Sequence, residues 1–334
     1  MVVHEESVKS DNVKFKPEEN QNENELVLYC YHHCFHSQKV LMALYEKNLS
    51  FTIHIVDVTK NEQYQKWFLN INPRGTIPVL KDGIKYIPSS KRILNYLEDN
   101  FSNGEHKRLI PIDKGMKTKQ TVVNFHEKLC RISPFMVTIG SFINNRWSRD
   151  FKYPYSIPTV RHLIKVSTLK NFQTIRKYAF ENPQFTESLL QRAQEEEKKN
   201  FWAVSHDQYL ATIDSIEDLL NEAELALVDR EKDKADWWLF TDSFTIADIS
   251  FIILLDRLSR LGMEASMWTR GVRPHIDMYF QRAQQRKSYK KTIPTIKTDI
   301  TFFLRTRSHL IIGFSLVTAI ITGLVGGFIL LKNK

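Results

Sequence analysis

Apolar and polar residues alternate along the first third of the chain with two different periods. Short apolar runs of strand length predict strands at residues 25–31, 51–58, 76–80 and 84–87. Apolar residues at helical spacing predict helices at residues 37–47, 62–70 and 89–100. Lys81-Asp82-Gly83 reads as the turn of a hairpin between the last two strands. The order β-α-β-α-β-β-α predicts a mixed sheet packed against helices.

A proline-containing linker at residues 109–113 ends this first region, and no strand pattern follows it. Helical periodicity continues at residues 115–147, 160–178, 183–228, 245–261 and 274–288. We therefore predict a small α+β domain at residues 25–105 and an all-α domain at residues 114–292. Residues 1–24 are polar and acidic, which predicts a disordered lead-in.

The last long apolar stretch, residues 310–331, is 22 residues without a charge. About 20 apolar residues suffice to cross a bilayer as a helix, so we predict a transmembrane tail anchor. The alternative is a buried core helix, which is seldom so long and so uniformly apolar. Basic residues on both flanks indicate the outer mitochondrial membrane with the bulk of the chain in the cytosol. The peroxisomal and endoplasmic-reticulum membranes are the alternatives.

Small residues recur within this stretch at every fourth position, which places them on one face of a helix. They are Ser315, Ala319, Gly323 and Gly327. Small side chains let two membrane helices approach closely, so these residues are candidates for packing in a homodimer. The alternative is that small residues are simply common in membrane helices.

The net charge of +9 is concentrated near the C-terminus. Residues 281–334 hold ten Lys and Arg against one acid, which equals the whole excess. The preceding part is neutral overall, so we expect no nucleic-acid partner. Residues 293–309 form a basic juxtamembrane segment that either lies on anionic lipid or serves as a solvated linker. The three cysteines cannot form a closed disulfide framework, and their scarcity suggests a reducing compartment.

Cys34 is the candidate catalytic residue, since it lies between a predicted strand and the start of a predicted helix. A thiol at a helix N-terminus faces the positive end of the helix dipole, which favours the thiolate. His33, His36 and Lys39 are placed to support it. The alternative is an unreactive, half-buried cysteine. The histidines and cysteines of this segment lack the distant second pair of ligands that zinc needs, so we expect no metal.

Three segments resemble glutathione S-transferases. They are the strand-turn-helix at residues 28–44, the run Asn-Pro-Arg-Gly-Thr-Ile-Pro-Val-Leu at residues 72–80, and the following helix that begins with Ser89-Ser90. Thr245-Ile246-Ala247-Asp248 resembles the helix-capping box of that family. The resemblance covers about residues 25–292, and it implies a thioredoxin-like N-terminal domain followed by the all-α domain.

A narrower resemblance is to the family of ganglioside-induced differentiation-associated protein 1. It rests on Ser37-Gln38-Lys39-Val40 with Glu46-Lys47, on an extra segment at about residues 156–200, and on the apolar tail. The identity looks partial, which suggests an invertebrate member. The resemblance implies a role in mitochondrial and peroxisomal fission, redox homeostasis and membrane contacts. It also implies a homodimer, with protein partners bound through the helical insertion.

The same resemblance implies a glutathione site. Pro78 follows Ile77 in the cis-proline position, where the backbone of Ile77 would pair with glutathione. Ser90 stands where the γ-glutamyl end binds, and Lys39 and Ser89 complete the candidate set. Ser89 replaces an acid of the family, and a neutral hydroxyl cannot pair with the γ-glutamyl ammonium.

Two functions remain open from the sequence. The first is a membrane-anchored adaptor or redox sensor on a transferase scaffold, which the missing acid and the insertion favour. The second is a glutathione-dependent thiol transferase or reductase, because Cys34 and its neighbours resemble the omega class, which uses a cysteine at this position.

Overall fold

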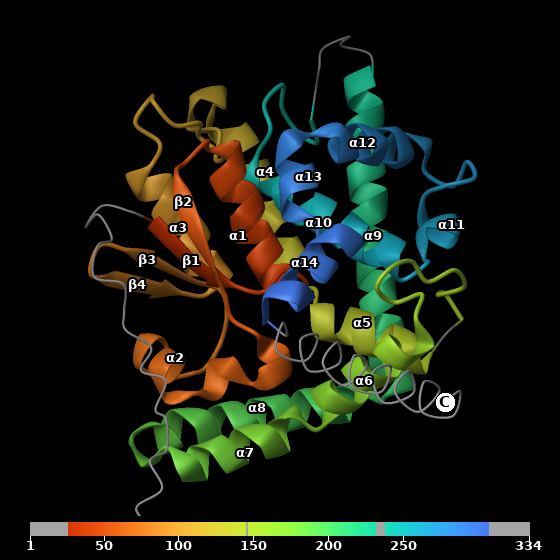
Figure 1. Ribbon diagram of the computed structural model, residues 1–334. Helices are drawn as coiled ribbons and strands as arrows, with labels where there is room; N and C mark the ends of the chain where they lie inside the picture. The colour runs from red at the N-terminus through yellow and green to blue at the C-terminus, as the bar shows by residue number, and fades with distance from the viewer. Residues whose placement is uncertain (1–25, 145, 232–237, 307–334) are drawn as a thin grey trace, which may run out of the picture.

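A computed structural model describes residues 26–144, 146–231 and 238–306 (Figure 1). In it a four-stranded sheet lies beside a larger bundle of helices. The predicted disordered lead-in at residues 1–24 and the predicted membrane span at residues 310–331, with Ser315, Ala319, Gly323 and Gly327, lie outside the described residues. Both therefore stay predictions.

The sheet is mixed, as the sequence predicts. Its strands are β1 (Leu26–Cys30), β2 (Phe51–Ile55), β3 (Val79–Asp82) and β4 (Lys85–Pro88), in the spatial order β2-β1-β3-β4. β1 pairs in parallel with β2, while β1–β3 and β3–β4 are antiparallel. A parallel pair needs a crossover, and α1 (Phe35–Glu46) supplies it.

Alternating side chains send the two faces of the sheet into different cores. Leu28 and Leu80 join a large cluster with residues of α1 and α3 (Ser90–Asn100). Val79 packs on the opposite face with Phe68 of α2 (Lys66–Ile71). Two short 3-10 turns, Val58–Lys60 and Glu62–Tyr64, lead into α2. The sheet is thus covered by helices on both sides.

The predicted hairpin exists, but its turn was placed one residue too early. The strands end at Asp82 and resume at Lys85, so Gly83 and Ile84 form a two-residue turn. A tight turn of this kind needs positive φ, and Gly83 has φ +55°. The third strand begins at Val79 rather than residue 76, because Pro78 has no N–H to donate to the ladder.

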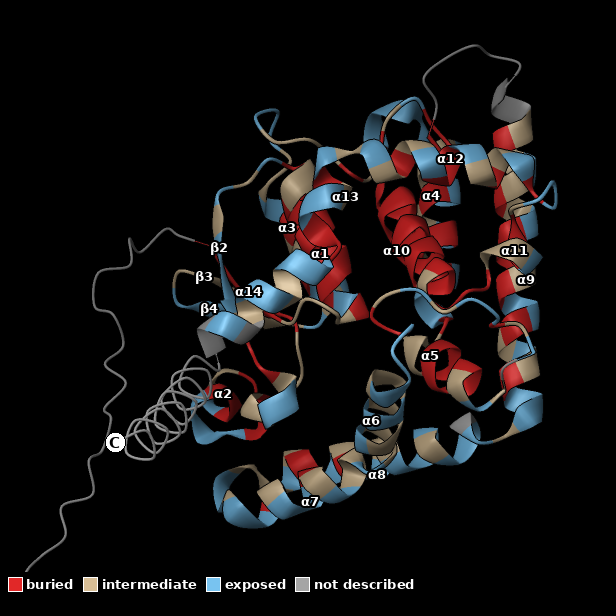
Figure 2. Cartoon of the chain, turned by 45° about the vertical axis from the view of Figure 1, so that its right-hand side comes forward, coloured by how far each residue is buried: buried red, intermediate tan, exposed pale blue. Residues whose placement is uncertain are grey.

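The rest of the described chain is helical, as predicted, with a further 3-10 turn at Ile112–Lys114 and another at Pro183–Phe185. The helices are α4 (Met116–Arg131), α5 (Pro134–Ile143), α6 (Pro158–Leu169), α7 (Asn171–Glu181), α8 (Thr186–Ala203), α9 (His206–Glu231), α10 (Ile246–Arg260), α11 (Glu264–Met267), α12 (Pro274–Gln285), α13 (Lys287–Thr292) and α14 (Ile296–Thr306). Figure 2 shows α10 as the buried helix in the middle of the bundle.

Several of the predicted long helices are each broken in two, including the one at 160–178, which forms α6 and α7. The predicted helix at 115–147 stops at Arg131 because Pro134 cannot continue it, and Ser133 caps the next helix by accepting the Met136 N–H. The predicted helix at 183–228 is interrupted between Ala203 and His206. Apolar periodicity alone does not register such a change of direction.

The predicted capping box starts α10. The Asp248 carboxylate accepts the Thr245 backbone N–H at 2.7 Å. It also accepts the Leu239 N–H at 2.9 Å and the Tyr279 hydroxyl at 2.8 Å. Burial raises the pKa of Asp248, and these donors oppose that shift. The box therefore ties α10 to α12 as well as starting a helix.

The segment predicted as an insertion forms α6, α7 and most of α8 (Figure 1). α7 and α8 pack together below α2, where the Tyr64 hydroxyl donates to Asn171 at 3.0 Å. Arg74 pairs with Glu195 of α8 at 2.7 Å, and Arg192 donates to the Arg74 carbonyl at 2.8 Å. The insertion thus fastens the loop that precedes Pro78.

The predicted juxtamembrane segment continues as α14, which returns to the folded body instead of leaving it. Among the helices of the described ranges, none combines the length and the apolar character that a bilayer crossing requires.

One buried ion pair invites a stability test. Lys47 and Glu98 lie 2.6 Å apart with side chains 0% and 6% exposed. We expect Glu98→Ala to lower the free energy of unfolding by about 3 kcal/mol, because it leaves a buried ammonium without its counter-charge. Urea unfolding of the purified chain measures this.

Lys177 and Glu181, exposed and 3.7 Å apart, provide the matched control pair. Glu181→Ala should change the free energy of unfolding by less than about 0.5 kcal/mol. If the two substitutions lowered the free energy of unfolding equally, the buried pair would not stabilise the fold more than the exposed one.

Candidate functional site

The candidate site lies where the loop between β1 and α1 meets the first turn of α3. The Ser89 N–H donates to the Pro78 carbonyl at 3.2 Å. The Ser90 hydroxyl lies 3.4 Å from Nδ1 of His36, on the first turn of α1. These contacts bring Pro78, Ser89 and Ser90 next to the helix that Cys34 begins, and their role in a glutathione site stays a prediction.

Cys34 is the N-cap residue of α1, with φ −75° and ψ 116°. Its carbonyl accepts the Gln38 N–H at 2.9 Å, so it closes the first turn of the helix. The helix begins at Phe35, two residues before the predicted start, which brings the thiol closer to the helix end than the sequence indicated. The side chain is partly exposed. A thiolate here would face the free N–H groups of the first turn.

Pro78 and Ser89 give the site its backbone geometry. The Ile77–Pro78 peptide bond is cis, which confirms the expectation. Ser89 has φ +78°, a region that residues other than glycine seldom occupy. Such a conformation concentrates at functional sites, where the surrounding structure holds it in place. Ser90 is the first residue of α3, so backbone N–H groups of that turn are available to an anion.

Lys39 turns away from Cys34. It is 2% exposed, and its ammonium lies 3.7 Å from the Cys130 sulfur of α4 and 4.9 Å from the centre of the Phe35 ring. Within the described ranges, no hydrogen bond joins Lys39 to Cys34 or to Ser90. Its assignment to a glutathione site therefore stays a prediction without a contact of its own.

The two histidines beside Cys34 have different surroundings. Burial lowers the pKa of His36 to about 4, and the nearby Lys39 and Arg257 charges add to the shift, so this imidazole is neutral at pH 7. His33 instead faces α14, with its Nε2 2.9 Å from the Asp299 carboxylate. Neither contact is to the Cys34 sulfur.

α14 lies directly against the Cys34 loop. Asp299 also accepts the Tyr153 hydroxyl at 2.5 Å, and this donor together with His33 lowers the pKa of Asp299 against the effect of burial. The Phe302 ring meets the rings of Tyr31 and His32 edge-on, at centroid distances of 6.2 and 5.9 Å. The sequence pattern missed this contact, although Asp299 is the only acid in residues 281–334.

A second helix holds the same loop from the all-α domain. Arg257 of α10 donates to the His33 carbonyl at 3.0 Å and to the Thr138 hydroxyl at 3.0 Å. The guanidinium is 5.7 Å from the centre of the Phe35 ring. Sequence analysis did not single out Arg257, because nothing in its neighbours distinguishes it from an arginine on a helix surface.

Metal ligands do not converge at this site. Across the described ranges, no group of three or more His, Cys, Asp or Glu residues is arranged to hold an ion.

Comparison with known proteins identifies several that are similar to this chain. The family model for the glutathione S-transferase N-terminal domain matches residues 28–105. Ganglioside-induced differentiation-associated protein 1-like 1 of Homo sapiens is 28% identical over 287 residues, which cover 82% of this chain and 75% of the human protein.

Two solved structures share the arrangement of sheet and helices. The β-etherase LigF of a Sphingobium species aligns with a TM-score of 0.52 at 23% identity, over 80% of this chain and 98% of that one. Ure2p in complex with S-hexylglutathione aligns with a TM-score of 0.53 at 16% identity, over 82% and 100%. The fold is therefore that of a glutathione S-transferase: a thioredoxin-like sheet domain followed by a helical domain.

The match to the human relative is longer than either domain alone, since it extends over 287 residues. Over 82% of its length the chain is thus similar to the ganglioside-induced differentiation-associated protein 1-like 1 proteins of human and mouse, and its N-terminal part matches the glutathione S-transferase N-terminal domain.

Proposed function

We propose that this chain is a tail-anchored protein of the outer mitochondrial membrane that regulates mitochondrial dynamics, fission and redox homeostasis as an adaptor or redox sensor. The contact between α14 and the Cys34 loop carries the proposal. α14 leads toward the apolar stretch at residues 310–331 and also touches Tyr31, His32 and His33. Oxidation of the Cys34 thiol would therefore occur next to the helix that leads to the proposed membrane span.

The chemistry of the Ser89–Ser90 turn favours an adaptor over an efficient transferase. Ser89 offers a hydroxyl where charge pairing with the γ-glutamyl ammonium requires an acid. The cis Ile77–Pro78 bond and the start of α3 still provide backbone groups for a peptide and a carboxylate. Glutathione is the cofactor we propose, held weakly, in line with the glutathione analogue in the Ure2p complex.

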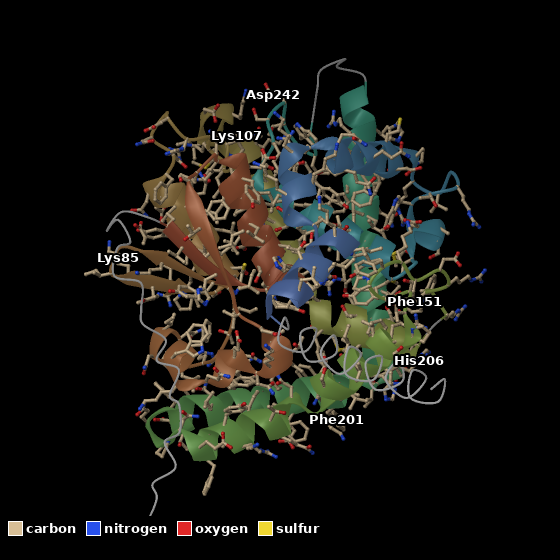
Figure 3. All side chains as sticks on the ribbon, viewed as in Figure 1. Lys85, Lys107, Phe151, Phe201, His206 and Asp242 are labelled. Atoms are coloured by element: carbon tan, nitrogen blue, oxygen red, sulfur yellow. The ribbon has the colours of Figure 1, made fainter. Side chains whose placement is uncertain are left out.

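The insertion is the surface we propose for protein partners. Phe180 and Phe201 on α7 and α8 are 88% and 76% exposed. Figure 3 shows Phe201 on the outer layer formed by these helices, away from the sheet. We also propose a homodimer, supported by the small residues Ser315, Ala319, Gly323 and Gly327 within the tail.

The second candidate function is an omega-like thiol transferase, which the N-cap position of Cys34 favours. The Cys34 thiolate would attack the glutathionyl sulfur of a mixed disulfide, form a new disulfide with glutathione and release the substrate as a thiolate. A second glutathione thiolate would then attack that disulfide, leave as glutathione disulfide and regenerate the Cys34 thiolate.

Glutathione titration separates the two functions. We expect the wild-type chain to bind glutathione with a Kd no tighter than about 1 mM in calorimetry, and to show no adduct on Cys34. Ser89→Glu should tighten binding by about tenfold, because it restores a charge opposite the γ-glutamyl ammonium.

Ser89→Gln is the matched control, since it has the same length and backbone demand but no charge. Tight binding by the wild type, with an adduct from added glutathione disulfide that Cys34→Ser abolishes, would establish the transferase instead.

The tail supplies the cellular test. In cells that express the full chain, deletion of residues 310–331 should disperse the protein into the cytosol and remove its effect on mitochondrial length, because a helix of this kind anchors a chain effectively irreversibly. Fluorescence microscopy with a mitochondrial marker measures both. Cys34→Ser should keep the mitochondrial location. A truncated protein that stays on mitochondria would contradict the anchor.

A further inference from the structure

Cys130 lies at the C-terminal end of α4, and its residue is exposed to solvent. Two nitrogen groups contact its sulfur from different directions. The Lys39 ammonium on α1 is 3.7 Å away, and Nε2 of His126, one turn earlier on α4, is 3.5 Å away. The thiol is therefore one member of a three-residue cluster at the junction of the two domains.

Lys39 is a buried cation that needs an anion. The residue is 2% exposed, and within the described ranges its recorded polar contact is the Cys130 sulfur. The Phe35 ring contributes only a cation–π contact. Burial lowers the pKa of Lys39, and the Cys130 sulfur counteracts that shift. An unpaired buried charge is costly, so a negative charge on the sulfur stabilises the ammonium beside it.

His126 places a neutral imidazole beside the sulfur. Burial lowers its pKa to about 4, so the imidazole is neutral at pH 7 and has one acceptor nitrogen. Its Nδ1 lies 2.9 Å from the hydroxyl of Ser250, which is fully buried on α10. With the proton on Nδ1 and donated to Ser250, Nε2 becomes the acceptor that faces Cys130. The imidazole therefore adds no positive charge of its own, and the Lys39 ammonium is the cation of the cluster.

The other two cysteines lack these neighbours. Cys30 is wholly buried, and desolvation raises its pKa far above the usual range, which makes it inert. The Cys34 sulfur has no hydrogen bond to a charged or basic side chain within the described ranges. Cys130 alone of the three combines exposure, a cation and an acceptor.

We propose that Cys130 is a reactive thiol and a modification site, which forms mixed disulfides with anionic disulfides of low molecular mass. The Cys130 thiolate attacks one sulfur of the incoming disulfide, a new sulfur–sulfur bond forms, and the other half leaves as a thiolate. The proton of the Cys130 thiol is lost to water before the attack, and the leaving thiolate is released into solvent. The proposal is independent of Cys34 and of the function proposed above.

The probe is dithiobis(nitrobenzoate), a disulfide with two carboxylates that releases a coloured thiolate. We use the full chain in detergent micelles with Cys34→Ser, so that Cys130 is the remaining accessible thiol. Release of colour should be at least about tenfold faster than in the Lys39→Met variant of the same chain, since that substitution removes the charge and keeps the side-chain length. Mass spectrometry should place the adduct on Cys130.

Lys128→Met is the matched control. Lys128 lies on the same helix, but it is exposed and pairs with Glu222 at 2.7 Å, away from the sulfur. Its substitution should leave the rate unchanged within about twofold, because exposed charges are screened by solvent. Equal rates in the Cys34→Ser chain with and without Lys39→Met would overturn the proposal.

A second measurement needs no substitution at the buried lysine. In the Cys34→Ser chain, Cys130 should react faster when folded than when unfolded in urea, since folding creates the cluster; mass spectrometry follows the Cys130 adduct separately, because unfolding also exposes Cys30. A folded rate equal to or below the unfolded rate would overturn the proposal even if Lys39→Met failed to fold.

Discussion

The buried pair between Lys47 and Glu98 fixes the relation of the two domains. The Glu98 carboxylate accepts the backbone N–H groups of Leu109 and Ile110, while the Lys47 ammonium donates to the carbonyls of Phe101 and Lys107 at 3.0 and 2.9 Å. The chain that enters the interdomain linker is thus held by charge-assisted bonds as far as Ile110. Leu109 in turn accepts the Ile246 N–H at 3.0 Å, at the start of α10. Because α10 then runs past α1, the linker determines where Arg257 meets the Cys34 loop.

Much of the fold can be predicted from the sequence because its determinants are local. Strand periodicity, the Thr245–Asp248 capping box and the cis position of Pro78 each depend on a few consecutive residues. The helix breaks at Pro134 and after Ala203 were less accessible, since the apolar period continues across them. The hairpin turn was predicted at residues 81–83 but consists of Gly83 and Ile84. Only the pairing register of the two strands reveals this small shift.

The site was harder to predict because its side chains find partners far away in the sequence. Lys39 lies one turn beyond Cys34 on α1, and its residue type suggested support for that thiol. Packing against α4 instead directs its ammonium to Cys130, 91 positions along the chain. His33 and Asp299 are separated by 266 positions. No local pattern encodes such pairs, since they follow from how the helices of the second domain cross the first.

The electrostatics of the domain junction separate two ways of activating a thiol. At Cys34 the backbone supplies the positive potential, which no single side-chain substitution removes. At Cys130 the positive potential comes from the Lys39 ammonium. Because Lys39 is buried, solvent screens its charge little, but burying that charge also costs desolvation free energy. Ser89 adds no acid to the turn at α3, so this turn offers an ammonium group no counter-charge of its own. Such a turn discriminates between ligands by charge, because a plain carboxylate meets the N–H groups at the start of α3, whereas the zwitterionic end of glutathione leaves its ammonium unpaired.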